Sequence, residues 1–238
     1  MLLRDGELPS ASELEEFRCI LHKRYEVKRN IRQMMWALPA DGHPMDVLQT
    51  AIAAMATFYP DAGAKDPNSA FTQNALTKII ANMSTLVAMW ARIRVGYDPI
   101  PPSKNMSYAK NFLYMSFGEE PDDDIVQLFD ACLILHAEHT INASTFSAMV
   151  TASTLANPFA SISAAVGTLA GSLHGGANED VLKMLDEIGD AKNVRGYIEN
   201  RLKNKQVIMG MGHREYRVKD PRATILQEMI EAYIKKSG

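Results

Sequence analysis

The sequence has few cysteines, no excess of positive charge and no long apolar run. Its two cysteines, Cys19 and Cys132, lie far apart in apolar periodic segments, so we expect two buried free thiols rather than a disulfide framework. The net charge is -3 and the basic residues are dispersed among carboxylates, which excludes the basic surface of a nucleic-acid-binding protein. No apolar run reaches the roughly 18 residues that a membrane span requires, so no membrane segment is expected.

Targeting signals and low-complexity tracts are also missing. Residues 1–10, MLLRDGELPS, lack the basic region and apolar run of a secretory signal. Internal repeats and linkers rich in glycine and serine are absent. The 238 residues, of which 47% are apolar, are enough for one large domain or for one domain with a smaller neighbour. We therefore expect a soluble cytoplasmic protein.

Helical periodicity is present through most of the chain, and strand-like alternation is absent apart from a few residues near Val207. Ser12 and Glu15 fit a capping box, and Pro44 suits the start of a helix. Segment 69–95 is apolar on most faces, so we expect a helix buried centrally or against another subunit. Further helices are expected at 121–139, 158–171, 177–188, 193–203 and 221–235.

A change in composition after residue 175 indicates a second domain, because charged residues and glycines become more frequent there. The prediction is an all-α protein with a large helical domain over 1–174 and part of a smaller helical domain over 175–238.

The first segment that could carry chemistry is HAEHTINAST. Its His136 and His139 are three residues apart and would share one face of a helix, where they could act together or bind a metal. A metal site is disfavoured, because the segment lacks the i, i+4 histidine pair of zinc proteases and no cysteine cluster is nearby. The alternative is a polar network at a helix end or a subunit contact.

The second segment is GSLHGGANEDVLKML. Two glycines follow His174, and a helix is expected to open near Asn178, so its free N–H groups and positive end would lie close to the imidazole. That field favours the neutral ring, which can donate a hydrogen bond to a developing enolate oxygen. The alternative is a glycine-rich turn that happens to contain a histidine.

The third segment is QVIMGMGHREYRVKDPRATIL, where four basic residues follow His213 within nine positions. Such a cluster suits a dianionic or phosphorylated ligand, and Pro221 would place Arg222 at the positive end of a helix. The glycines do not form a dinucleotide fingerprint. The alternative is a solvated basic loop.

Together, in this order and at these separations, the three segments resemble the citrate synthase family. LLRDGELPSASELEEF and HPMDVL are also similar to its large domain. The resemblance implies a helical homodimer that closes over acetyl-CoA and oxaloacetate and condenses them to citrate. It implies no metal or redox cofactor, since coenzyme A enters as a thioester substrate.

The resemblance also implies roles for single residues. His139 would bind oxaloacetate, His174 would donate to the thioester oxygen, and His213 would polarise the oxaloacetate carbonyl. Arg222 would hold a carboxylate of oxaloacetate, and Arg217 would contact a phosphate of coenzyme A. The backbone that would surround the adenine belongs to Val207, Ile208, Met209, Gly210, Met211 and Gly212.

Some positions depart from the family pattern, among them Glu138, Ser172 and Met211, but none removes a proposed catalytic group. Family members continue into a segment with a catalytic aspartate and further arginines, which nothing in this chain matches. We therefore expect an enzyme shortened at both ends, inactive by itself. Two alternatives stay open: a 2-methylcitrate synthase that uses propionyl-CoA, which differs by one methylene, and a non-catalytic dimerising fragment.

Overall fold

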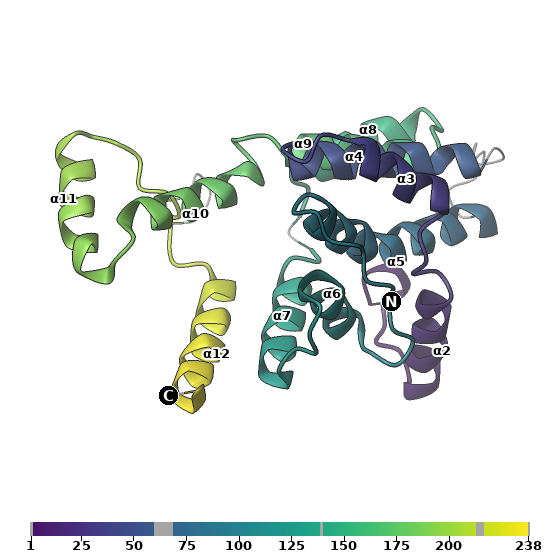
Figure 1. Cartoon of the computed structure of the whole chain (residues 1–238), viewed down its shortest axis with the longest axis horizontal. Coiled ribbons are helices and arrows are strands. Elements are labelled where there is room, and N and C mark those ends of the chain that lie inside the picture. Colours follow the sequence, from purple (N-terminus) through teal and green to yellow (C-terminus); the bar gives the residue numbers. More distant parts are fainter. Residues whose placement is uncertain (1, 60–68, 139, 213–216, 238) are drawn as a thin grey trace.

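The computed structural model describes residues 2–59, 69–138, 140–212 and 217–237, and within these ranges the fold is all-α, as predicted (Figure 1). No strand occurs in these ranges, so the region near Val207 is loop. No helix of the described parts is long and apolar enough to cross a membrane.

The α-helices are α1 (Leu2–Asp5), α2 (Ala11–His22), α3 (Arg29–Ala37), α4 (Pro44–Met55), α5 (Ala70–Ile93), α6 (Tyr108–Phe117), α7 (Asp123–Leu135), α8 (Ala143–Ser153), α9 (Pro158–Leu169), α10 (Gly176–Ile188), α11 (Val194–Lys203) and α12 (Pro221–Ser237). Two short 3-10 helices are η1 (Ala56–Phe58) and η2 (Ala191–Asn193).

Helix α5 is the centre of the fold. It begins after Ser69, whose side chain accepts the backbone N–H of Thr72, and it packs against α2, α3, α4, α6 and α9. Half of its residues are buried by these helices. The long buried helix predicted over 69–95 is thus confirmed. Because the chain's own helices cover most of α5, its apolar character does not by itself require a second subunit.

The hydrophobic core lies where α3, α4, α5 and α9 meet. Ile31, Met35, Ile52 and Leu86 are at most 2% exposed, and Phe159 from α9 is fully buried. Burial of each such side chain contributes about 1.5–3 kcal/mol relative to leaving it in water. This core fixes α9, which leads directly into the turn that carries His174.

Polar side chains of α5 hold the connection between α2 and α3. Asn82 is 1% exposed, and its amide donates to the carbonyl oxygens of Arg24 at 2.7 Å and Tyr25 at 3.0 Å. Thr85 donates to the same Tyr25 carbonyl, and the ammonium of Lys78 donates to the Arg24 carbonyl at 2.9 Å. Burial lowers the pKa of Lys78 and raises the pKa of Tyr25 to about 12. These bonds satisfy carbonyls that no helix satisfies and fix α2 on α5.

Helix α12 packs antiparallel against α7, which in turn packs on α6. An ion pair joins Lys236 near the end of α12 to Asp124 near the start of α7, and Arg222 contacts the carbonyl of Leu135 at the opposite end. Helix α11 lies apart from the core helices (Figure 1), whereas α10 meets the start of α4, where Oε2 of Glu179 lies 3.2 Å from Nε2 of His43. The division into domains at residues 174 and 175 stays a prediction.

Two local predictions were wrong. The capping box at the start of α2 is formed by Ser10 and Glu13 rather than by Ser12 and Glu15. The pattern Ser-x-x-Glu occurs twice in this stretch, and the helix begins at the first copy, so Ser12 lies inside it. The two cysteines were predicted to be buried, but Cys132 is only half-buried and Cys19 is exposed, because Phe17 and Leu21 turn toward α5 and leave Cys19 on the opposite face of α2. Helices α1, α6 and α8 were not predicted.

Candidate functional site

The connection between α7 and α8 is the first component of the site. Helix α7 ends at Leu135 with His136 as its C-cap, so the predicted continuation of this helix past Leu135 is wrong. The ring Nδ1 of His136 lies 2.6 Å from the carbonyl of Cys132. Further along, Thr140 has a φ of +56°, which a β-branched residue rarely adopts. Strained backbone of this kind is concentrated at functional sites.

His174 lies in the turn between α9 and α10, half-buried, and its ring contacts the start of α8. Its Nε2 lies 2.9 Å from Oγ of Ser144, and the backbone N–H of Ser144 points at the same atom at 3.4 Å. The Ser144 hydroxyl also donates to Oδ1 of Asn142 at 2.8 Å, so its oxygen is placed to accept an N–H from the imidazole, while the backbone N–H of Ser144 is placed to donate to the ring. Both tautomers fit these contacts, which fix the position of the ring.

The helix whose first turn contacts the ring of His174 is α8. Asn142 is the N-cap of α8, and its side chain accepts the N–H of Thr145 at 2.8 Å. Ser144 therefore belongs to the first turn of α8, whose free N–H groups form the positive end of the helix. The prediction placed His174 at the N-terminus of α10, which begins at Gly176, whereas the atoms that touch its ring belong to α8.

The glycines after His174 allow close contact within the protein. A Cβ on Gly175 would lie 2.7 Å from the carbonyl oxygen of Leu169, and a Cβ on Gly176 would lie 2.9 Å from that of Ala170. Side chains at these positions would push the turn off the C-terminal end of α9. The two glycines therefore allow the turn that carries His174 to pack directly on the end of α9.

Arg222 stands in the first turn of α12 and is held on two sides. Its Nη2 lies 2.7 Å from Oδ2 of Asp220, and its Nη1 donates to the carbonyl of Leu135 at 3.3 Å. The guanidinium thus lies at the C-terminal, negative end of α7, a favourable place for a cation. Arg222 and His174 consequently contact opposite ends of the same α7–α8 connection, which contains His136 and His139.

The structure describes only some of the remaining predicted site residues. His139 and His213 lie outside the described residues. Residues 207–212 form the loop between α11 and α12, where Met211 donates its backbone N–H to the Ile208 carbonyl and Gly210 packs near Val181 of α10. Gly210 and Gly212 have φ values of +80° and +82°, which require glycine. The positions whose side chains are exposed there are Val207, Met211 and Arg217.

Sequence reasoning missed three residues that shape this site: Asn142, Ser144 and Asp220. The Asn-Ala-Ser-Thr run before an apolar stretch is a helix N-cap signal, and the Asp-Pro-Arg run is another. Those signals locate the helix starts. They do not reveal that the first start would meet His174, about 30 residues further along the chain.

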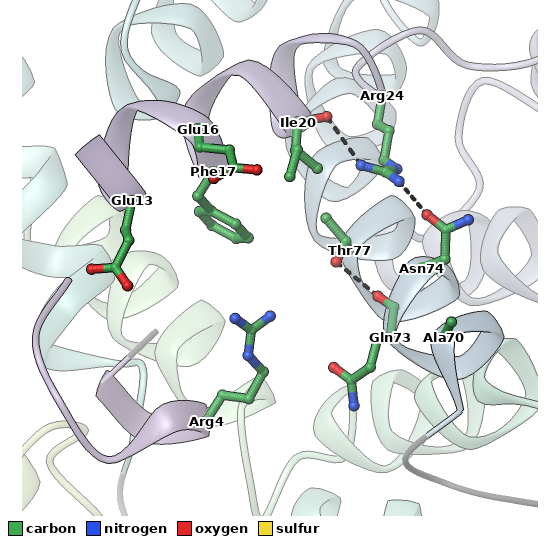
Figure 2. Close-up of a pocket in the computed structure, with 10 residues that line it drawn as sticks. All are labelled: Arg4, Glu13, Glu16, Phe17, Ile20, Arg24, Ala70, Gln73, Asn74 and Thr77. Carbon is green, nitrogen blue, oxygen red and sulfur yellow. Dashed lines mark hydrogen bonds between the residues drawn. The ribbon is translucent and has the colours of Figure 1, made fainter. Parts of the chain in front are cut away.

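Other hollows of the described surface lie away from these residues. A cavity of about 510 Å³ opens between α1, α2 and α5, with Phe17 and the guanidinium of Arg4 pointing into it (Figure 2). A larger hollow of about 730 Å³ lies between the end of α2 and residues 99–104. None of the predicted site residues lines either of them. In the described parts of the chain, no three His, Cys, Asp or Glu side chains gather as metal ligands would.

Comparison with known proteins agrees on one family. The sequence model described as citrate synthase, C-terminal domain, matches residues 1–238. The chain is 53% identical over 237 residues to the citrate synthase of Synechocystis, covering 100% of this chain and 59% of the relative. It is 40% identical over 230 residues to 2-methylcitrate synthase of Mycobacterium tuberculosis, covering 97% of this chain and 58% of that protein.

Two solved structures are similar to this chain over nearly all of its length. Citrate synthase from Pyrobaculum aerophilum superposes with a TM-score of 0.86 at 35% identity, covering 100% of this chain and 61% of that one. Citrate synthase from Thermoplasma acidophilum, in a ternary complex with carboxymethyl coenzyme A and oxaloacetate, gives a TM-score of 0.86 at 31% identity, covering 99% and 61%. The chain thus spans about three fifths of the length of these proteins.

Proposed function

This chain belongs to the citrate synthase family, and on that premise we propose that the product of its reading frame condenses acetyl-CoA with oxaloacetate to give citrate and free coenzyme A. The proposal rests on two contacts, one at each end of the α7–α8 connection: His174 with Ser144, and Arg222 with the carbonyl of Leu135. A neutral N–H donor and a guanidinium are the groups that an enolate oxygen and a dicarboxylate need. The ternary complex of the Thermoplasma acidophilum relative contains carboxymethyl coenzyme A and oxaloacetate.

The proposed chemistry is a Claisen-type condensation. A carboxylate base removes a proton from the acetyl methyl while a ring N–H of His174 stabilises the oxygen of the resulting enol. The enol carbon attacks the ketone carbon of oxaloacetate, and His213 gives a proton to the oxygen that becomes a hydroxyl. His139 and Arg222 orient oxaloacetate. Water then cleaves the thioester of citryl-CoA.

Coenzyme A would be held by the α11–α12 loop. We propose that the backbone of residues 207–212 surrounds the adenine and that Arg217 meets a phosphate. The positive φ values of Gly210 and Gly212 support this, because they expose backbone N–H and carbonyl groups without side chains in front of them. No metal or redox cofactor takes part in the proposed reaction.

The direct test is release of thiol when the product of the full reading frame is mixed with acetyl-CoA and oxaloacetate. Propionyl-CoA should be assayed in parallel, because the Mycobacterium tuberculosis relative is named a 2-methylcitrate synthase. One methylene in an acyl pocket changes transition-state binding by about 1–3 kcal/mol, so kcat/KM should differ about 10- to 200-fold in favour of acetyl-CoA. A higher kcat/KM for propionyl-CoA than for acetyl-CoA would instead assign 2-methylcitrate synthase activity.

Replacing Arg222 with alanine in that protein should raise the KM for oxaloacetate steeply. The loss should be on the order of 2–5 kcal/mol, because a substrate carboxylate would lose its charged partner in a partly desolvated site. Steady-state kinetics with oxaloacetate as the varied substrate measures it. Arg195→Ala on the exposed face of α11 is the matched control and should leave KM unchanged. An unchanged KM for Arg222→Ala would remove the carboxylate-binding role.

We further propose that the active protein is a homodimer. Support comes from α8, which exposes more than half of Phe146 and Val150 and buries none of its residues in this chain. Such an apolar helix face beside the site suits contact with a second copy. Light scattering at micromolar concentration should give twice the mass of the chain. A monodisperse monomer would contradict the proposal.

A further inference from the structure

We propose that His43 and Glu179 are positioning residues, whose contact holds the first turn of α10 against the start of α4 and so keeps the ring of His174 in place. The inference rests on the proposed role of His174 as the donor to the thioester oxygen. It assigns a function to a contact between two helices that takes no part in the proposed chemistry itself.

The contact joins a helix of the core to the helix that follows His174. Nε2 of His43 lies 3.2 Å from Oε2 of Glu179. His43 is the N-cap of α4, which packs on α9, and Glu179 belongs to the first turn of α10. In the described parts of the chain, α10 packs extensively on none of the earlier helices. This side-chain contact therefore ties the start of α10 to the core.

The partners of His43 define the direction of both of its hydrogen bonds. Its Nδ1 lies 3.3 Å from the backbone nitrogen of Met45, and that N–H can only donate, so Nδ1 accepts. The ammonium of Lys183 and the ring of His43 lower the pKa of Glu179, which keeps this carboxylate ionised and able only to accept. Nε2 thus carries the proton of the neutral ring and donates it to Glu179. One tautomer satisfies the helix cap and the bridge to α10 together.

The first turn of α10 is joined to the backbone of His174 by short-range hydrogen bonds. The carbonyl of His174 accepts the N–H of Ala177 at 3.2 Å, and the carbonyl of Gly175 accepts the N–H of Asn178 at 3.2 Å. A shift of this turn would therefore move the backbone that carries the imidazole.

The turn is held from three sides. Its glycines pack on the end of α9, and the ring of His174 contacts the start of α8. Neither attachment prevents α10 from swinging about Gly175 and Gly176, because the backbone torsions of glycine are the least restricted. The contact of Glu179 with His43 is the third attachment, and it opposes this motion.

The expected effect is moderate, because the side chains are 43% exposed for His43 and 48% exposed for Glu179. A pair as exposed as this shifts an equilibrium by at most about fivefold. Catalysis is more sensitive than overall stability to the displacement of a donor, since the charge of the transition state must be met at hydrogen-bond distance. Loss of the contact should therefore lower kcat without unfolding the protein.

The test is Glu179→Ala in the product of the full reading frame. Its kcat at saturating substrates should fall about three- to fivefold, while the KM for oxaloacetate changes less than about twofold. Glu179→Gln keeps a side-chain oxygen that can accept Nε2–H, so it should restore most of the lost kcat. An equal fall in Glu179→Gln would overturn the proposal. A higher kcat in Glu179→Ala would also overturn it, because the contact would then restrain a motion that turnover needs.

A substitution on the other side of the contact tests the same bridge. His43→Asn keeps a good helix cap but removes the ring, so it should lower kcat as much as Glu179→Ala does. The double variant should show no further loss, since both changes break one contact. Additive losses would mean that the two residues act separately and would contradict the proposal.

Asp180→Ala is the matched control. It removes a carboxylate from the same part of α10, which pairs with the same Lys183 at 3.3 Å. Its kcat should change less than about twofold. A loss equal to that of Glu179→Ala would show that negative charge at the start of α10, and not the contact with His43, is what matters.

Hydrogen exchange gives a readout that does not depend on activity. The backbone N–H groups of residues 171–178 should exchange about three- to fivefold faster in Glu179→Ala, and at the original rate in Asp180→Ala. Unchanged exchange in Glu179→Ala would overturn the proposal. If His174→Ala lowers kcat and Glu179→Ala does not, the positioning role is wrong while the proposed function stands. If His174→Ala leaves kcat unchanged, the proposed function fails first and the positioning role falls with it.

Discussion

Replacing His174 with alanine in the product of the full reading frame is expected to lower kcat by about 10²–10⁴, with a much smaller change in the KM for oxaloacetate. The acetyl methyl is a weak carbon acid, so the charge that develops on the thioester oxygen needs a donor that is already in place. The contacts of Nε2 with Ser144 and the turn packed on α9 hold the ring in place. Thiol release at saturating substrates measures the change.

Two further variants test the structural reason for that loss. His22→Ala, at the end of α2, removes a ring that contacts the Met106 carbonyl outside the site and should change kcat less than about threefold. Ser144→Ala removes only the hydroxyl, while its backbone N–H remains, so its loss should lie well below that of His174→Ala. A kcat for His174→Ala within tenfold of the unchanged protein would show that this ring is not the donor.

Much of the fold follows from local chemistry that the sequence displays. Pro44 and Pro158 each stand at the first position of a helix, and segment 69–95 is apolar on most faces and becomes the central helix. Periodicity and caps of this kind act within a few residues, so they can be read without knowing the tertiary structure. Helices α6 and α8 were not predicted, although each begins after a polar N-cap residue, Ser107 and Asn142.

The sequence could predict individual residues of the candidate site, but not how they are arranged in space. His174 and Arg222 were found because glycines or basic residues surround them. Their partners, Ser144 and the carbonyl of Leu135, lie 30 and 87 residues away. Packing of α8 on α9 and of α12 on α7 creates these contacts. Sequence spacing carries no information on such packing.

Expressed by itself, the 238-residue chain is expected to fold but to release no measurable thiol from acetyl-CoA and oxaloacetate. The core at α3, α4, α5 and α9 is complete within the described residues, so a helical circular dichroism spectrum and a cooperative thermal transition should be seen. Enolisation, however, needs a carboxylate base as well as the donor His174. The resemblance assigns that base to an aspartate in a segment that no part of residues 1–238 matches, and loss of a general base costs about 10²–10⁴ in rate.

The deficit should exceed that of any single substitution, because the same unmatched segment carries further arginines for oxaloacetate, so orientation and exclusion of water would suffer together with proton transfer. The product of the full reading frame, assayed at equal concentration, is the control and should be active. Turnover near roughly one per second by the 238-residue chain would lie in the ordinary range of enzymes and would overturn the assignment of the base. Inactivity of both proteins, with folding and dimerisation intact, would favour the non-catalytic dimerising role instead.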